Sequence, residues 1–348
     1  MISRLARMIE PKPVETVLVV GAGIAGLMAA RRLRERGITV TVVDKARGVG
    51  GRLATRRFGG GVYDHGAQFV TVESEDFRER MAPWIERGVL LEWSRGFMGS
   101  DGSFPNDRFP RLRGRSGMTA LPKALAEGLD VRLNTQVQRV SWRGHFWEAR
   151  TTGDEELVAD ALILTAPVPQ ALALIDAGNF EVPAATRHRL DAITYDPCLA
   201  VMARIAGPSR LPRPGAIELA GEPLAWIADN HRKGISPGAH AVTIHAGPQF
   251  SRDRWDESDE AISSEILATA APWLGAEVRE SQLKRWRYAQ ATRPSDAPCC
   301  VVHPHPPLVL AGDGFSGGGV ERAALSGESA ANAAVTIPKP KILELLGL

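Results

Sequence analysis

An apolar run near the N-terminus of the chain is followed by a helical pattern of small and apolar residues. Residues 17–20, Val-Leu-Val-Val, are continuously apolar, which is typical of a strand buried on both faces. After a glycine turn, Ala30, Leu33 and Gly37 follow at helical spacing, and residues 40–43 form a second apolar strand. The pattern predicts a strand, a tight turn, a helix and a second strand, in β-α-β order.

Later segments predict further helices and strands. In the predicted helices apolar residues recur at helical spacing. In the predicted strands they alternate with polar residues or form continuous apolar runs. The predicted helices are residues 77–87, 118–129, 258–274 and 320–335. The predicted strands are residues 69–72, 131–142, 146–150, 157–164, 199–205, 241–246, 283–288 and a segment from Leu308 that ends in Ala311-Gly312-Asp313.

A change in pattern along the chain predicts two domains. From about Asn179 the segments become longer strands with one helix, which indicates a mostly antiparallel sheet, and the chain then returns to the first pattern. We expect a discontinuous α/β nucleotide-binding domain and a second, α+β substrate domain. The first is predicted at residues 14–95, 116–175 and 289–336, and the second at residues 96–115 and 176–288.

The first turn has the spacing of a nucleotide-binding motif. Gly21, Gly23 and Gly26 form a G-x-G-x-x-G, in which they serve the tight turn, the approach to a phosphate and close helix packing, respectively. Asp44 ends the second strand, where it can accept hydrogen bonds from a ribose diol. Gly50-Gly51-Arg52 follows at once. The N-terminus of the predicted helix therefore faces a pyrophosphate.

Composition argues against several other classes. The 42 basic and 40 acidic residues nearly balance, which gives no support to a nucleic-acid or membrane partner. Three cysteines without a C-x-x-C favour a reducing compartment, so we expect a cytoplasmic protein. Residues 1–8 lack the apolar core of a signal peptide. His303-Pro304-His305 has no third ligand in view, so we expect no metal.

Together the motifs resemble the flavin amine oxidase superfamily and, within it, the bacterial renalase branch. The resemblance rests on G-A-G-I-A-G at 21–26, G-G-R at 50–52, D-H-G-A-Q-F at 64–69, R-W-R-Y-A at 285–289 and A-G-D at 311–313. It implies a Rossmann-like domain of the glutathione-reductase type that binds FAD without a covalent link. The residues expected at the cofactor are Gly21, Gly23, Ile24, Ala25, Gly26, Asp44, Lys45, Gly51, Arg52, Ala67, Gln68, Val137, Gly312, Asp313 and Val320.

The second glycine segment favours FAD over NAD. FAD binds extended across its domain, so a distant segment has to meet the ribityl chain and the flavin ring. Asp313 can accept hydrogen bonds from sugar hydroxyls. The helix from Val320 can direct its N-terminus at the flavin, where negative charge develops on reduction. The alternative is a structural Gly-Asp turn before an ordinary helix.

Two aromatic residues are candidates for the catalytic site. Trp286 and Tyr288 alternate on one face of a strand with Lys284, while Arg285 and Arg287 lie on the other face. The aromatics could hold a flat ring parallel to the flavin, as hydride transfer requires. The alternative is that both are core residues. Lys284 is the candidate for the lysine that many amine oxidases place near the flavin.

Gln68 and His245 complete the predicted catalytic set. Gln68 lies in a loop that should pass the flavin or the substrate, where its amide could orient a carboxamide or a flavin edge. The alternative is a hydrogen bond that only stabilises a turn. His245 could face the cavity or be a core histidine. His65, in the same loop as Gln68, could link to a flavin, but a hydrogen-bonding role is the commoner one.

The resemblance implies oxidation of misreduced dihydropyridine isomers of NAD(P)H, with O2 as the electron acceptor and hydrogen peroxide as a product. Such a ring becomes aromatic when it loses hydride and needs no base, whereas an amine must first be neutral. Arg108, Arg111, Arg113 and Arg115 could bind the phosphates of a dinucleotide, or form a solvated loop. The alternatives are an amine oxidase, a desaturase and a flavin-binding regulatory protein without turnover.

Overall fold

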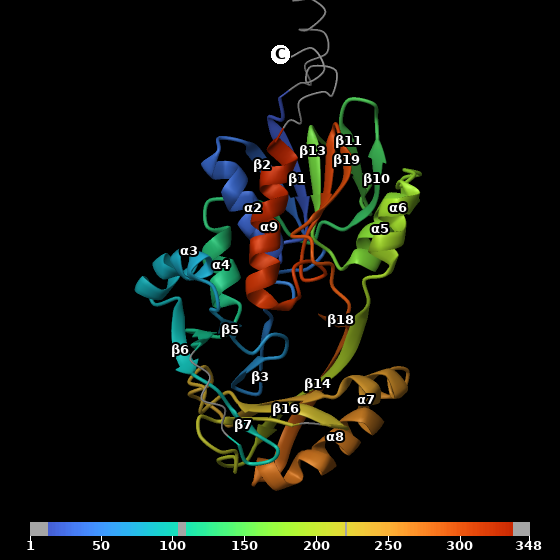
Figure 1. Cartoon of the computed structure of the whole chain (residues 1–348). Helices are drawn as coiled ribbons and strands as arrows, with labels where there is room; N and C mark the ends of the chain where they lie inside the picture. Colours follow the sequence, from blue (N-terminus) through green and yellow to red (C-terminus); the bar gives the residue numbers. More distant parts are fainter. Residues whose placement is uncertain (1–12, 104–108, 220, 337–348) are drawn as a thin grey trace, which may run out of the picture.

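The computed structural model describes residues 13–103, 109–219 and 221–336, which form two lobes (Figure 1). The N-terminal segment examined for a signal peptide, and Arg108 of the basic loop, lie outside these residues. Each lobe contains one six-stranded sheet. The chain passes between the lobes more than once, because each sheet combines strands from distant parts of the sequence.

The first lobe is built on a sheet in the order β19-β20-β13-β1-β2-β9. Its strands are β1 (Thr16–Val20), β2 (Thr39–Val43), β9 (Asp130–Arg132), β13 (Ala161–Leu164), β19 (Cys300–Pro304) and β20 (Pro307–Leu310). The β19–β20 pair is antiparallel and the other pairs are parallel. Val17 and Val19 belong to one hydrophobic core and Leu18 and Val20 to another. Burial on both faces explains the continuous apolar run of β1.

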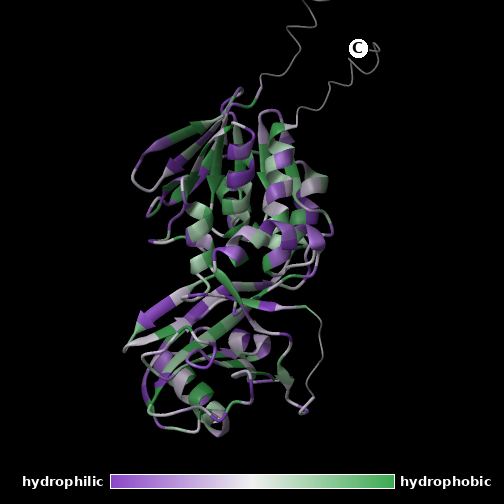
Figure 2. Ribbon diagram, turned by 90° about the vertical axis from the view of Figure 1, so that its left-hand side faces the viewer, coloured by the Kyte–Doolittle hydropathy of each residue, from purple (hydrophilic) through white to green (hydrophobic). Residues whose placement is uncertain are grey.

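Helices cover both faces of this sheet. One face carries α2 (Ile24–Glu35), α3 (Glu75–Glu86), α4 (Ala120–Ala126) and α9 (Gly319–Val335). The other carries α5 (Val168–Ala177), α6 (Ala184–Asp191) and a sheet of β10 (Val137–Trp142), β11 (Trp147–Thr151) and β12 (Glu156–Ala159). Figure 2 shows hydrophobic residues along the strands enclosed by these layers. α2 and α9 touch at Gly327, where a Cβ would lie only 2.0 Å from the carbonyl oxygen of Ala25.

Two segments that were each predicted as one strand contain two strands in the structure. The segment 131–142 contains β9 and β10, which belong to different sheets. Between them Asn134, with a φ of 53°, donates from its backbone N–H to the carbonyl of Ala46 at 3.0 Å and turns the chain. The segment 157–164 contains β12 and β13, divided at Asp160, whose carboxylate binds the start of β1. Both breaks depend on partners distant in sequence, which local alternation does not reveal.

The second lobe contains a sheet in the order β18-β14-β17-β16-β15-β7. Its strands are β7 (Met98–Gly99), β14 (Tyr195–Ile205), β15 (Ala216–Glu218), β16 (Leu224–Asp229), β17 (Ala241–Ala246) and β18 (Val278–Ala291). The β15–β7 pair is parallel and the rest are antiparallel. α8 (Asp259–Leu274) packs on one face, with α7 (Pro248–Asp253) beside it. The predicted α/β class with a mostly antiparallel second sheet is confirmed.

Short strands lie between the two large sheets. β3 (Thr55–Phe58) and β4 (Gly61–Asp64) form a hairpin, and β8 (Arg111–Gly114) pairs with β5 (Val70–Thr71) and β6 (Leu90–Ser94). Residues 96–115, which were predicted to belong to the second domain, therefore contribute β7 to the second sheet and β8 to this smaller sheet. The predicted domain boundaries stay a prediction. Among the helices of the described ranges, none has the length and hydropathy needed to cross a bilayer.

Candidate active site

The first glycine turn leaves a cradle at the N-terminus of α2. Gly21 has a φ of 114° and donates from its N–H to the carbonyl of Val43 at 2.8 Å. A Cβ on Gly26 would lie 1.9 Å from the carbonyl oxygen of Gly21, so only glycine fits there. A Cβ on Gly23 would meet no described atom within 4 Å. The Gly23 backbone therefore borders open space, as close approach to a phosphate requires.

The second glycine pair closes the same cradle. Gly50 forms a bridge with Gly23 and donates from its N–H to the carbonyl of Ala22 at 2.8 Å. A Cβ on Gly51 would lie 3.5 Å from the Cα of Gly23. The first turn of α2, which includes Ile24 and Ala25, has no acidic residue and no side-chain cap among the described residues. Its backbone N–H groups are thus available to an anion.

Asp44 connects the turn to the next predicted contact. Its carboxylate accepts from the backbone N–H groups of Ala22 at 2.7 Å and Ala46 at 2.8 Å, which fixes the turn beside the end of β2. Its carbonyl accepts from the N–H of Thr135 at 2.9 Å, so the chain leading to Val137 passes this end of the cradle. Lys45 is exposed. A carboxylate has capacity for further donors, so the arrangement is compatible with a ribose at Asp44.

Arg52 and Asp313 meet at the other end of the cradle. Arg52 Nη1 and Nη2 lie 2.5 and 2.6 Å from Asp313 Oδ2 and Oδ1, and Nη1 also donates to the carbonyl of Tyr288 at 3.2 Å. Burial alone would lower the pKa of Arg52, but the Asp313 carboxylate raises it overall. Gly312 donates from its N–H to Ser326 Oγ at 3.0 Å and fixes this turn. The two motifs thus form one site with charged and polar groups suited to a phosphate and sugar hydroxyls.

The N-terminus of α9 opens beside Asp313. Gly318 precedes the helix with a φ of 84°, and among the described residues no side chain caps this end. A Cβ on Gly317 or Gly319 would meet no described atom within 4 Å. Glu321, in the same turn as Val320, instead accepts from Ser74 Oγ at 2.6 Å. No side chain of the described residues therefore occupies the end of the helix, and the predicted contact of Val320 with the cofactor stays a prediction.

Trp286 and Tyr288 face the first lobe. Trp286 Nε1 donates to the carbonyl of His65 at 2.8 Å, and the two rings stack with centroids 5.3 Å apart and an interplanar angle of 18°. Tyr288 packs edge-on against Tyr195 at 5.6 Å. Arg287 lies on the other face of β18, with its guanidinium 4.7 Å from the ring centroid of Trp255. The strand presents its faces as the alternation predicted.

We call Trp286 and Tyr288 together the wall. One row of residues crosses the second sheet beside this wall. The strand register places Lys284, Ala200, His245 and Trp226 opposite one another on β18, β14, β17 and β16. Ala200 leaves room between its larger neighbours. His245 Nε2 lies 3.5 Å from Nε2 of Gln68, which belongs to the loop after β4. Trp226 lies on β16, a strand that the sequence analysis did not predict, and its ring packs against Phe69 and Phe97.

Both histidines of the site are held neutral. Burial lowers the pKa of His245 to about 4. Burial, followed by the positive charge of Lys284, lowers the pKa of His65 to about 4. Lys284 Nζ lies 5.1 Å from the ring centroid of Trp286, so the lysine borders the wall. At neutral pH these imidazoles carry no charge and are weak bases.

Lys233 is the principal residue that sequence analysis missed. Its Nζ lies 2.7 Å from Asp64 Oδ2 and donates to the carbonyl of Gln68 at 2.6 Å, and both charged side chains are fully buried. Asp64 also accepts from Thr55 Oγ1 at 2.6 Å. The pair therefore ties the loop that carries His65 and Gln68 to the second lobe. Asp64 belongs to the quoted D-H-G motif, but no motif marks Lys233.

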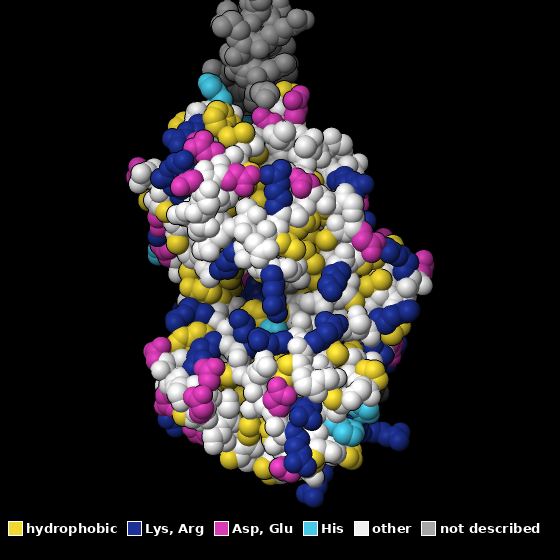
Figure 3. Space-filling view, turned by 180° about the vertical axis from the view of Figure 1, so that it is seen from behind, with side chains coloured by type: hydrophobic (Ala, Val, Ile, Leu, Met, Phe, Trp, Pro, Cys, Tyr) yellow, Lys and Arg dark blue, Asp and Glu magenta, His cyan; other side chains and the backbone are white. Residues whose placement is uncertain are grey.

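Arg111 and Arg115 of the basic loop contact residues of the smaller sheet and its surroundings, and the predicted binding of phosphates by this loop stays a prediction. Arg115 Nε donates to the carbonyl of Gly88 at 2.7 Å, and Arg111 lies 5.7 Å from the ring centroid of Phe69. Burial lowers the pKa of Arg113. Figure 3 shows a hollow between the lobes with Lys and Arg side chains around it. Lys284 has its Nζ 5.1 Å from the ring centroid of Trp286, and the positive charges of Lys284 and Arg56 both lower the pKa of His65.

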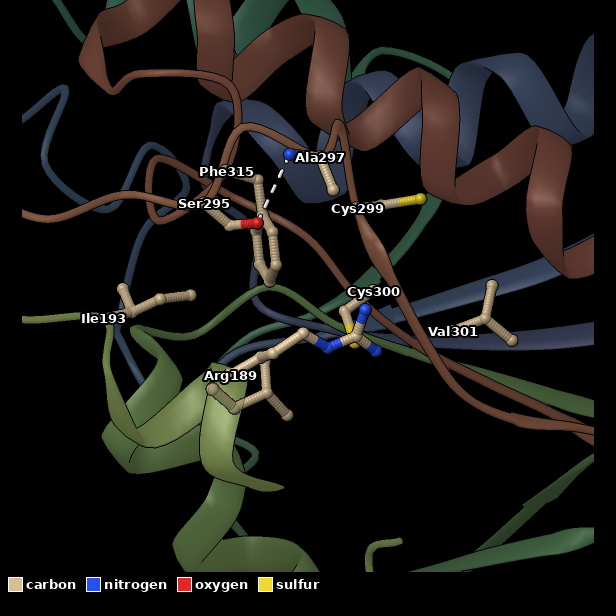
Figure 4. A pocket seen from close by; sticks show the side chains of 9 residues that line it. Arg189, Ile193, Ser295, Ala297, Cys299, Cys300, Val301 and Phe315 are labelled. Atoms are coloured by element: carbon tan, nitrogen blue, oxygen red, sulfur yellow. Dashed lines mark hydrogen bonds between the residues drawn. The ribbon is translucent and has the colours of Figure 1, made fainter. Parts of the chain in front are cut away.

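A cavity of about 160 Å³ lies elsewhere, between α6 and β19 (Figure 4). It is lined by Arg189, Leu190, Ile193, Ser295, Ala297, Cys299, Cys300, Val301 and Phe315. Burial raises the pKa of Cys300, although Arg189 opposes the effect, and burial raises the pKa of Cys299 to about 11. Thiols in this state are poor nucleophiles.

Comparison with known proteins decides the family. The profile described as flavin containing amine oxidoreductase matches residues 77–335, more than half of the chain, and that of an NAD(P)-binding Rossmann-like domain matches residues 19–82. The chain belongs to the flavin-containing amine oxidoreductase family. It is an FAD-dependent oxidoreductase, and the cradle from Gly23 to Asp313 fits the cofactor, since it combines an open helix N-terminus with carboxylates of a kind that can accept hydrogen bonds from sugar hydroxyls. The predicted family and cofactor are confirmed.

Individual relatives agree with this membership. Renalase of Mus musculus is 28% identical over 327 residues, which cover 86% of this chain and 93% of that protein. A putative protoporphyrinogen oxidase from Exiguobacterium has a TM-score of 0.70 at 14% identity, covering 92% of this chain and 98% of its own. A putrescine oxidase bound to putrescine has a TM-score of 0.69 at 17% identity, covering 91% and 98%. These two likenesses show the fold.

Proposed function

We propose that this family member oxidises dihydropyridine isomers of NAD(P)H, with O2 as the final electron acceptor. When bound, FAD supplies the hydride acceptor and passes the electrons to O2, which yields hydrogen peroxide. The chain holds the flat substrate ring against the wall of Trp286 and Tyr288 and shields it from water. The similarity to mouse renalase over 93% of that protein supports this substrate class.

The position of Lys284, whose Nζ lies 5.1 Å from the ring centroid of Trp286, is the observation that carries the proposal. Lys284 and Arg56 both lower the pKa of His65. Asp64, the carboxylate that raises it, is already paired with Lys233 at 2.7 Å. An alkylammonium substrate would be repelled by these cations, whereas a dinucleotide brings phosphates, which guanidinium and ammonium groups bind.

The neutral histidines point to the same class. An amine must lose a proton before oxidation, and an imidazole with a pKa of about 4, as in His65 and His245, is a weak acceptor for it. A dihydropyridine becomes aromatic as hydride leaves and needs no such base.

The three cysteines are unpaired thiols, which supports a reducing compartment, and we place the activity in the cytoplasm.

Anaerobic mixing of the holoenzyme with borohydride-derived NADH isomers tests the proposal. We expect the flavin absorbance to bleach rapidly and to return, with formation of hydrogen peroxide, when O2 is admitted. Putrescine is the matched amine. Bleaching by the amine alone would make the protein an amine oxidase. Bleaching by neither would leave a desaturase acting on an apolar substrate, or a flavin-binding protein without turnover.

A further inference from the structure

The cavity of about 160 Å³ lies at one edge of the six-stranded sheet of the first lobe. It is bordered on one side by α6 and on the other by the edge strand β19 and the chain that leads to it (Figure 4). Arg189, Ala297 and Val301 line the cavity and are exposed, so it is open to solvent. A cavity of about 150 Å³ accommodates one benzene molecule. The space therefore fits a ligand with a single ring.

The walls of the cavity combine one cation with apolar side chains. Leu190, Ile193 and Phe315 supply hydrocarbon surface. Arg189 is the charged residue of the lining, and its Nη2 donates to Thr186 Oγ1 at 3.3 Å. A guanidinium has five N–H donors, so most of them remain for a ligand. Such a cavity suits a molecule that carries an anionic group on an apolar body.

The guanidinium of Arg189 is directed across the cavity. Figure 4 shows it beside Cys300, and its positive charge opposes the rise in the pKa of that thiol. Two carboxylates of α5 and α6, Asp176 and Asp191, are paired with Arg187 instead, at 2.7 and 3.1 Å. Among the side chains that the structure describes, no carboxylate therefore competes with an incoming anion for Arg189.

The cavity adjoins the turn that holds Asp313. Ser295 and Phe315 form a bridge, in which the N–H of Ser295 donates to the carbonyl of Gly314 at 2.8 Å. The N–H of Phe315 donates to the carbonyl of Gly312 at 3.1 Å, so Asp313 lies inside the same hydrogen-bonded turn. Because Ser295 and Phe315 both line the cavity, a ligand there would touch both sides of the bridge. Occupation of the cavity therefore restrains the turn that presents Asp313 to its arginine partner.

We propose that the cavity binds a small aromatic monocarboxylate, with its carboxylate on Arg189 and its ring against Ile193 and Phe315, and that the bound ligand retains FAD. The N–H groups of a guanidinium match the two oxygens of a carboxylate. A ligand that favours the FAD-bound form of the turn is, in return, bound more tightly when FAD is present. The lining residues are distinct from the wall, so the inference goes beyond the proposed function and does not depend on its substrate.

Titration of the holoenzyme with 4-fluorobenzoate tests the site, because the fluorine NMR signal of a small ligand broadens when it binds a protein. We expect saturable broadening, and a Kd about fivefold higher for the uncharged 4-fluorobenzyl alcohol. Arg189→Gln should raise the Kd of 4-fluorobenzoate about fivefold, since it removes the cation and keeps a hydrogen-bond donor. Arg36→Gln, at the exposed end of α2, is the matched control and should leave the Kd unchanged.

A second variant fills the cavity instead of removing its charge. Ala297→Phe introduces a ring from an exposed position of the lining and should abolish the broadening. The same variant tests the link to the cofactor. Release of FAD on dilution, followed by flavin fluorescence, should slow at least about twofold with saturating 4-fluorobenzoate in the wild type and stay unchanged in Ala297→Phe.

Three outcomes would overturn the inference in whole or in part. Equal Kd values in the wild type, Arg189→Gln and Ala297→Phe would rule out the cavity as the binding site. A Kd raised by Lys284→Gln, and not by Arg189→Gln, would place the probe at the wall. Binding in the cavity without slower release of FAD would remove the link to the cofactor. These measurements contain no dinucleotide substrate, so failure of the proposed function would leave them unaffected.

Discussion

Arg52 and Asp313, separated by 261 positions in the sequence, form a bidentate ion pair with contacts of 2.5 and 2.6 Å. Arg52 follows the second glycine pair of the first lobe, and Asp313 lies in the turn just beyond the end of the returning strand β20. Their side chains are 29% and 10% exposed, so water screens the pair only in part. The contact joins both glycine segments into one cofactor site.

Asp313→Asn should weaken FAD binding about tenfold, because the substitution removes the charge partner of Arg52 and an acceptor for sugar hydroxyls. The ratio of flavin absorbance to protein after gel filtration measures the loss. Asp130→Asn, at an exposed position of β9, is the control and should keep its flavin. Full occupancy in Asp313→Asn would contradict the assignment of Asp313 to the cofactor.

Lys233→Met should destabilise the holoenzyme strongly, since it leaves the Asp64 carboxylate buried without its cation. Removing one partner of a buried pair costs about 3–5 kcal/mol. The double variant Lys233→Met/Asp64→Asn removes both charges and should recover part of that loss. Thermal unfolding measures all three proteins, with the exposed Lys123→Met as control. Equal Tm values for the single and double variants would show that the pair has no such role.

Acid should destabilise the protein between about pH 6.5 and pH 4. Burial lowers the pKa of both His65 and His245 to about 4, so the unfolded chain binds protons in this window that the folded protein does not. The free energy of unfolding therefore falls as the pH drops, by at most about 3 kcal/mol for each histidine. Tm measured against pH should show a shallower slope in His245→Gln than in the exposed control His188→Gln. Parallel curves would argue against a neutral His245.

Lys284→Gln and Arg56→Gln should each raise KM for the dinucleotide several-fold and leave kcat nearly unchanged, because the cations attract phosphates without touching the hydride. The effect should shrink as ionic strength rises, since salt screens exposed charges. Arg78→Gln, on the exposed surface of α3, is the matched control. A drop in kcat at constant KM would instead indicate that Lys284 acts at the flavin.

Local rules made the cofactor cradle predictable. Gly21 and Gly26 are required by a positive φ and by a contact of 1.9 Å, and these constraints act within a few residues of the turn. The same holds for α8, where Ser258 Oγ caps the N–H of Ala261 at 3.2 Å and Gly275 ends the helix with a φ of 67°. Elements that carry their own boundary signals can be read without the rest of the fold.

What the sequence determined by itself was the cofactor class, because glycine sterics and helix ends are properties of short segments. Only the tertiary structure decided which groups lie together at the candidate site. Lys233 pairs with Asp64, which is 169 positions away in the sequence, and Trp226 lies opposite His245 through the pairing of β16 with β17. Such contacts join residues far apart in the chain, and their formation depends on strand register and burial, which no short segment encodes.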